Sequence, residues 1–202
     1  MKTSPSLWQP ESYAELIGPA FGVGEVIAGK IARMKSEGSI AMRSLFHGEP
    51  GTGKSALAQL AALDLAGGEH LLLERISGIS GSLFAVGSFQ VKLIEELDRV
   101  PDAAQILLLD YLDRTRAFPD VALIGTSNAD VDKLQERFQT RLQYWPVEKP
   151  KADEIEKLLL RWNPNPGVAR MIAETCCGNV RQAMLDLEGH LDVEYVRRRK
   201  AA

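Results

Sequence analysis

The sequence predicts an α/β fold in which a parallel sheet is covered by helices on both faces and followed by a small helical unit. Two observations predict the sheet: short apolar runs alternate with segments of helical periodicity, and a glycine-rich turn joins the first run to a helix. The periodicity is helical throughout after Pro150, which predicts the helical unit. We therefore expect an α/β core with an N-terminal arm over residues 1–148, and a helical lid over residues 149–202.

The individual elements follow from local patterns in chain order. Residues 1–13 carry two prolines and no clear period, which predicts an arm, and residues 14–35 predict a helical region broken near its start by glycine and proline. The expected strands are 44–47, 70–76, 89–94, 121–125 and 142–147. The expected helices in the first part are 57–65 and one from Pro101 that carries Ile106, Leu109 and Leu112. Three more are expected at 152–162, 168–176 and 180–196. A Gly- and Ser-rich crossover is expected at 77–88.

Composition and charge exclude several classes of protein. Hydrophobic residues make up 45% and charged residues 25%, which is the balance of a globular chain rather than a disordered one. The net charge of −3 provides no overall basic field for nucleic acid, so any such binding would need a local patch. Cys176 and Cys177 are adjacent and cannot join distant segments, which favours a reducing compartment. With no signal peptide and no membrane-spanning run in the sequence, we expect a cytoplasmic protein with no membrane partner.

The strongest motif is the glycine-rich turn. Residues 48–55, Gly-Glu-Pro-Gly-Thr-Gly-Lys-Ser, match G-x-x-x-x-G-K-[ST] between an expected strand and an expected helix. Glycines let the backbone wrap around phosphate oxygens, and the helix that follows directs its positive N-terminal end toward them. We expect Lys54 to reach the β- and γ-phosphates and the Ser55 hydroxyl to bind Mg²⁺.

Two sites compete for the acidic residues that such a loop requires on a neighbouring strand. The run 106–109 ends at Asp110, but only ten residues separate it from the strand at Val121, and a parallel crossover needs a dozen or more. The other site is Glu95-Glu96, after the apolar run at 91–94, and it leaves room for a whole helix before the next strand. We therefore prefer Glu95 and Glu96 and expect residues 106–110 to form the apolar face of that helix.

With these motifs the chain resembles the AAA+ ATPases over nearly its whole length. Within that family it is most similar to the clamp-loader type and to the related branch-migration and replication-initiator motors. The residues that carry the resemblance are Ser12–Gly18, the loop 48–55 as Walker A, Leu93–Asp98 as Walker B, Leu123–Asn128 as sensor 1, and Gly178–Arg181 as sensor 2. The C-terminal collar and the Ser-Arg-Cys signature of clamp-loader subunits are absent from this sequence. One residue departs from the family pattern, because Glu95 stands where an aspartate is usual.

The resemblance implies a site for ATP and Mg²⁺. The nucleotide contacts it implies are Ile17, Gly18, Gly48, Glu49, Pro50, Gly51, Thr52, Gly53, Lys54, Ser55, Ala56, Asn128 and Arg181. Ser55 and Glu95 are the implied metal ligands. The longer side chain of Glu95 would shift the metal geometry, which bears on the rate of hydrolysis more than on nucleotide binding.

The implied catalytic residues are Glu96, Lys54, Asn128 and Arg181, together with an arginine finger from a neighbouring subunit. Glu96 would polarise the attacking water, and Asn128 would orient it or contact the γ-phosphate. Arg181 would report the state of the nucleotide to the lid. The finger would be Arg137, with Arg141 one helical turn on as the alternative.

The function implied is ATP hydrolysis coupled to shape change in a homo- or hetero-oligomer that acts on DNA or on a DNA-bound protein. Replication, recombination, and helicase or clamp loading are the expected processes. One alternative is an adaptor gated by nucleotide with little hydrolysis, which the glutamate at position 95 suggests. A small P-loop kinase is the other alternative.

Overall fold

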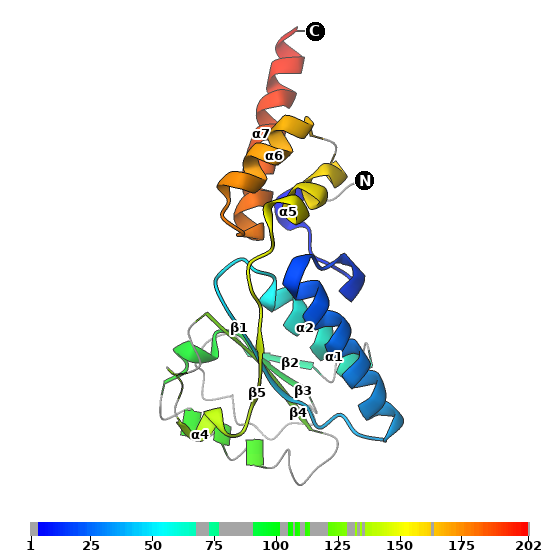
Figure 1. Cartoon of the computed structure of the whole chain (residues 1–202), viewed down its shortest axis with the longest axis vertical. Helices are drawn as coiled ribbons and strands as arrows, with labels where there is room; N and C mark the ends of the chain where they lie inside the picture. The colour runs from blue at the N-terminus through cyan, green and yellow to red at the C-terminus, as the bar shows by residue number, and fades with distance from the viewer. Residues whose placement is uncertain are drawn as a thin grey trace.

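The computed structural model describes residues 4–67, 73–76, 91–101, 105–106, 108–109, 112–113, 121–128, 132, 134, 136–162 and 164–201. In Figure 1 the α/β part lies below, the C-terminal helices lie above, and a single stretch of chain rises from β5 to α5. The part of the chain that the structure describes contains no helix that is both long and apolar enough to cross a bilayer.

Among the described residues, five parallel strands in the order β2-β3-β4-β1-β5 form a sheet at the centre of the lower part. Its strands are β1 (Arg43–His47), β2 (Leu73–Ile76), β3 (Val91–Ile94), β4 (Ala122–Ser127) and β5 (Gln143–Pro146). Every residue of β3 and β4 is buried, because both faces of the sheet are covered. Strands buried in this way have nearly continuous apolar sequences. The five expected strands are confirmed to within a few residues, except that positions 70–72 and 89–90 lie outside the described residues, as does the crossover at 77–88.

Helices cover both faces of the sheet, as expected. On one face lie α1 (Gly18–Ser36) and α2 (Lys54–Leu65), whose buried side chains Ile27, Ile31 and Leu57 pack with β1, β3 and β4. A second apolar cluster on the other face includes Leu97, Leu108, Leu109 and Leu112. Figure 1 shows the two faces covered separately, with α1 and α2 to the right of the sheet.

The helical region at 14–35 is broken just before Gly18 and Pro19, as expected, but not at Gly22 or Gly24, where the expected break is corrected. Residues 13–15 form a separate 3-10 turn, η2 (Tyr13–Glu15), and α1 then runs without interruption for 19 residues from Gly18. Gly24 is buried at a close approach, since a Cβ there would lie 3.0 Å from a methyl group of Leu16. The glycine therefore serves helix packing rather than helix termination.

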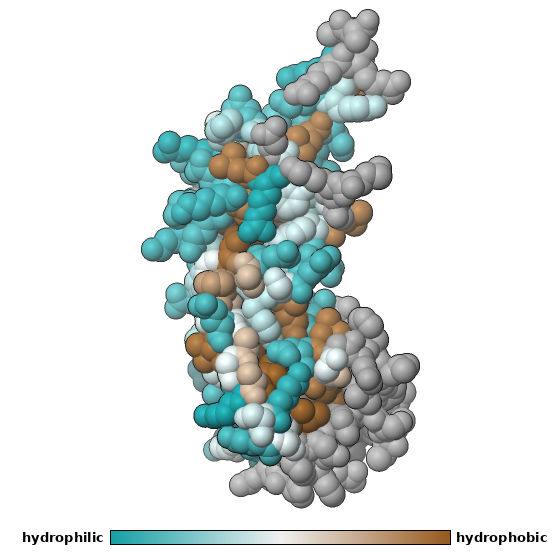
Figure 2. All heavy atoms as spheres, turned by 90° about the vertical axis from the view of Figure 1, so that its right-hand side faces the viewer, coloured by the Kyte–Doolittle hydropathy of each residue, from teal (hydrophilic) through white to brown (hydrophobic). Residues whose placement is uncertain are grey.

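The C-terminal part is helical throughout, as expected. It consists of α5 (Ala152–Leu159), the 3-10 turn η7 (Leu160–Trp162), α6 (Pro166–Thr175) and α7 (Val180–Ala201). These helices share a third apolar cluster, which includes Ile155, Ile172 and Leu187. On the face shown in Figure 2, hydrophilic side chains dominate the surface of this part. The separate cluster supports our proposal that residues 149–202 form a lid distinct from the core.

The N-terminal arm packs against this helical part. Its 3-10 turn η1 (Pro5–Leu7) contacts α7, and the Ser4 hydroxyl donates a hydrogen bond to the Glu188 carboxylate. Trp8 packs against the third apolar cluster, and its ring meets the edge of Trp162 with centroids 5.9 Å apart. The arm thus joins the two parts of the molecule.

Candidate functional site

The glycine-rich loop at 48–55 joins β1 to α2 and holds conformations that only glycine adopts readily. Gly51 has a φ of +79°, and a Cβ there would fall on the side-chain oxygen of Asn179, in the turn before α7. Gly48 has a φ of +146°, and a Cβ there would fall on the carbonyl oxygen of Val147. The loop therefore fits closely between the sheet and the lid, and both glycines are required sterically.

The side chain of Lys54 is 5% exposed and lies at the centre of this loop. Its Nζ donates a hydrogen bond of 2.6 Å to the carbonyl oxygen of Glu49, which also accepts one from the Thr52 hydroxyl at 3.1 Å. Burial, followed by the nearby positive charge of Arg181, lowers the pKa of the Lys54 amine to about 8. A phosphate group beside this amine would offset both the loss of solvation and the repulsion by Arg181. The loop therefore favours the binding of an anion.

The acidic residues chosen from the sequence follow β3, which is a strand of the sheet between β2 and β4. The Glu96 backbone N–H donates to the Thr126 hydroxyl at 3.1 Å, and the Asn128 side-chain amide donates to the Glu96 carboxylate at 3.3 Å. The Glu95 carboxylate accepts a hydrogen bond of 3.4 Å from the Gln59 side chain on α2. The structure thus brings Glu96 and Asn128 together at the carboxyl ends of neighbouring parallel strands, where ligands bind in such folds.

The competing acid, Asp110, lies outside the described residues. The residues around it are helical where the structure describes them, and Leu108, Leu109 and Leu112 are buried in the second apolar cluster. The described part of this segment is therefore helical rather than extended, but its expected apolar face is confirmed only in part, because Ile106 is 53% exposed. The choice of Glu95 and Glu96 as the acidic residues is consistent with this helix and stays a prediction.

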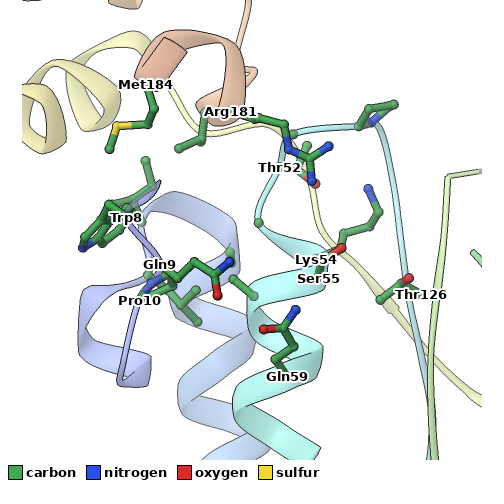
Figure 3. A pocket seen from close by; sticks show the side chains of 18 of the residues that line it. Trp8, Gln9, Pro10, Thr52, Lys54, Ser55, Gln59, Thr126, Arg181 and Met184 are labelled. Atoms are coloured by element: carbon green, nitrogen blue, oxygen red, sulfur yellow. The ribbon is translucent and has the colours of Figure 1, made fainter. Parts of the chain in front are cut away.

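A cavity of about 640 Å³ lies where the loop, the strand ends, the arm and the lid meet. The expected site residues that line it are Ile17, Pro50, Gly51, Thr52, Gly53, Lys54, Ser55, Ala56, Glu95, Glu96, Asn128 and Arg181. Gly18, Gly48 and Glu49 do not line it. Figure 3 shows the Arg181 side chain extending from the start of α7 toward Thr52, with Lys54 and Thr126 on the sheet side.

The lid contacts the loop directly through a backbone hydrogen bond and an ion pair. The Val180 N–H donates a hydrogen bond of 2.9 Å to the carbonyl oxygen of Gly51, and Lys149 forms an ion pair of 2.5 Å with Glu49. These contacts join the start of α7 and the chain after β5 to two residues in the first half of the same loop. A change in the loop would therefore be transmitted to the lid without an intermediary.

The two finger candidates lie elsewhere. Arg137 is exposed on the short helix α4 (Glu136–Gln139), and Arg141 follows it. Arg141 forms an ion pair with Asp113 at 2.9 Å and donates a hydrogen bond of 2.9 Å to the carbonyl oxygen of Arg137. Together with Lys30 and Arg43, Arg141 lines a separate cavity of about 300 Å³ at the amino ends of β1 and β5. The structure does not bring either arginine to the large cavity of its own chain.

Several lining residues were not identified from the sequence. They include Trp8, Gln9 and Pro10 of the arm, Gln59 of α2, Arg99 after β3, Thr126 of β4, and Met184 of α7. Figure 3 places Trp8, Gln9 and Pro10 at one end of the cavity, with Met184 above Trp8. The one signal available was Trp8 itself, since a large aromatic ring in a polar, proline-containing arm requires a surface to pack against.

The residues at the cavity fit a magnesium ion carried by a nucleotide. The Ser55 hydroxyl and the Glu95 carboxylate line the same cavity and supply oxygen donors, which Mg²⁺ prefers. Among the described residues no group of three or more His, Cys, Asp or Glu side chains could hold a metal. Mg²⁺ at phosphate sites is commonly bound by one or two protein groups together with phosphate oxygens and waters, so two donors suffice.

No family model matches the chain, but comparison with known proteins finds similar ones. The Holliday junction branch migration complex subunit RuvB of Myxococcus xanthus is 27% identical over 178 residues, which cover 76% of this chain and 50% of that protein. The chain therefore spans about half the length of this curated relative.

The solved structures of the Thermotoga maritima RuvB Holliday junction branch migration motor share the fold. One has a TM-score of 0.77 at 19% identity, and a variant of the same protein has 0.79 at 22% identity; each comparison covers 94% of this chain and 67% of the other. The resemblance to clamp loaders is therefore only approximate, and the resemblance to branch-migration motors is the one supported. The chain has the AAA+ ATPase fold, in the form found in the branch-migration motor RuvB.

Proposed function

We propose that this chain binds ATP with Mg²⁺ and hydrolyses it as one subunit of an oligomer. A single observation carries the proposal: the large cavity is lined at once by the glycine-rich loop, by Glu96 and Asn128 from two strand ends, and by Arg181 from the lid. A phosphate-binding loop needs both a water-activating acid and cations around the transferred group, and here they meet in one space.

Each residue then has a role that follows from its position. The loop backbone and Lys54 bind the phosphates, and the Lys54 amine neutralises charge that develops on the terminal phosphate during bond cleavage. Glu96 accepts the proton of the attacking water, which Asn128 orients from the neighbouring strand. Arg181 contacts the terminal phosphate from the lid side. Ser55 and Glu95 would hold Mg²⁺, which supplies further neutralisation of phosphate charge.

The catalytic arginine is supplied by a second subunit in this proposal. The phosphate loop follows the last residue of β1, whereas Arg141 lies at the amino end of β5, which runs parallel to β1. With five residues in β1, about 13 Å separates these two ends of the sheet, at about 3.3 Å per residue. Arg137 remains the first candidate because it is exposed, whereas Arg141 is held by Asp113.

We propose recombination of DNA as the process served, with DNA or a DNA-bound protein as the client. The support is the likeness to RuvB proteins, which are described as subunits of a Holliday junction branch migration complex. The cytoplasmic location expected from the sequence remains a prediction; within the described residues, Cys176 and Cys177 are both free thiols, which is compatible with it.

An adaptor that binds ATP with little turnover is the second candidate. Two observations favour it: Glu95 occupies the position where the family usually has aspartate, and the Glu96 carboxylate is held in an ion pair by Arg99 at 3.0 Å. The AAA+ fold argues against the small-kinase alternative.

Replacing the water-activating acid separates the two candidates. Glu96→Gln should retain ATP binding and lower hydrolysis by a factor of about 10²–10⁴, because the amide keeps the shape of the carboxylate but cannot accept the proton. Release of ADP over time measures hydrolysis, and Asp110→Asn is the matched control, which should keep the parent rate. A parent chain that binds ATP but releases no ADP would support the adaptor. An inactive Asp110→Asn together with an active Glu96→Gln would contradict the proposed site.

A further inference from the structure

The Glu96 carboxylate is engaged on both of its oxygens by described residues. Oε1 accepts the Asn128 amide at 3.3 Å, and Oε2 lies 3.0 Å from an Nη1 of the Arg99 guanidinium. A carboxylate whose charged form is stabilised by a guanidinium and an amide is a weaker base toward an attacking water. The ion pair therefore competes directly with the role proposed for Glu96.

The backbone around this pair is held firmly, while the Arg99 side chain is not. Glu96 has a left-handed φ of +54°, its N–H is bonded to Thr126, and the next residue, Leu97, is fully buried in the second apolar cluster. The Arg99 side chain, in contrast, is 72% exposed. Ion pairs this exposed contribute little to stability, so Arg99 can exchange its partner at little cost while Glu96 stays in place.

Arg99 lines the same cavity as Lys54 and Arg181, and all three are cations. A terminal phosphate in that cavity carries more negative charge than one carboxylate, and guanidinium groups bind phosphate through two parallel hydrogen bonds. ATP presents a γ-phosphate beyond the β-phosphate that both nucleotides share, and ADP lacks it. A triphosphate therefore provides a stronger partner for Arg99 than Glu96 does, whereas a diphosphate leaves the ion pair intact.

We propose that Arg99 is a positioning residue that senses the terminal phosphate: it holds Glu96 until ATP binds, then moves to the γ-phosphate and releases the carboxylate for the attacking water. The inference rests on the proposed function, because it requires ATP in this cavity.

The test measures the dissociation constants of ADP and of a non-hydrolysable imido analogue of ATP with the full chain. Arg99→Gln should weaken the analogue about five- to tenfold and leave ADP unchanged, since only the analogue has the group that Arg99 would contact. Arg99→Lys should recover part of the loss, because the charge remains but the fork of donors does not. Arg33→Gln, which removes an exposed cation of α1 away from the cavity, is the matched control and should change neither constant.

A second variant examines the exchange itself. In Glu96→Gln, Arg99 no longer gives up an ion pair when the analogue binds, so the analogue should bind a few-fold more tightly than to the parent. If Arg99→Gln weakens ADP and the analogue equally, or weakens neither, Arg99 does not sense the terminal phosphate and the inference is wrong. A parent chain that binds neither nucleotide overturns the proposed function and this inference with it, so the two failures are distinguishable.

Discussion

Raising the pH should weaken the binding of ATP through Lys54. Its amine has a pKa of about 8 in the free protein, lowered from the usual value by burial and then by Arg181. The charged form therefore falls from about nine-tenths at pH 7 to about one-tenth at pH 9, because each unit of pH past the pKa changes the ratio tenfold. If ATP binds only to the charged amine, its dissociation constant should rise about tenfold over this range.

The assay is a titration of ATP in the Glu96→Gln background, which prevents hydrolysis, at several pH values between 7 and 9. Lys54→Arg is the matched variant, because a guanidinium keeps its charge throughout this range and should give a dissociation constant that changes little with pH. Lys54→Ala should bind weakly at every pH. A parent constant that stays flat up to pH 9 would show that the amine keeps its proton, and that burial does not control its charge as reasoned.

Two further predictions concern the lid contact and the assembly. Gly51→Ala should weaken ATP binding at least tenfold and lower the free energy of unfolding by about 2 kcal/mol, because residue 51 has a left-handed φ and no space for a Cβ. The control is Gly29→Ala, on the open side of α1, which should raise the free energy of unfolding by up to about 1 kcal/mol. Thermal unfolding measures both changes in stability. Mixing Arg137→Ala with Lys54→Ala should restore part of the ATP turnover that each lacks alone, and turnover per chain should rise with protein concentration. Rescue by Arg141→Ala in place of Arg137→Ala would instead make Arg141 the finger, and no rescue by either would contradict an arginine supplied in trans.

Much of the fold and part of the site could be predicted from the sequence, because the signals are local. The loop at 48–55 is recognisable from its glycines and its Lys-Ser ending, whatever surrounds it. The choice of Glu95 and Glu96 over Asp110 needed only the number of residues that a parallel crossover requires; the helical residues around Asp110 agree with it, and the roles of both glutamates stay predictions. The alternating and helical periods likewise placed the strands and the C-terminal helices.

Other features depended on contacts between residues far apart in the chain. Trp8 packs against the helical part near Trp162, and nothing in the local pattern of the arm indicates that partner. Local pattern predicts a break at Gly24 as well as at Gly18, but α1 continues through Gly24, which allows a close approach to Leu16. The pairing of Glu96 with Arg99 depends on the left-handed turn at Glu96, a conformation that a glutamate rarely adopts and that the neighbouring strand supports through Thr126. Periodicity reports which face of an element is buried, but only tertiary packing decides which side chains meet there.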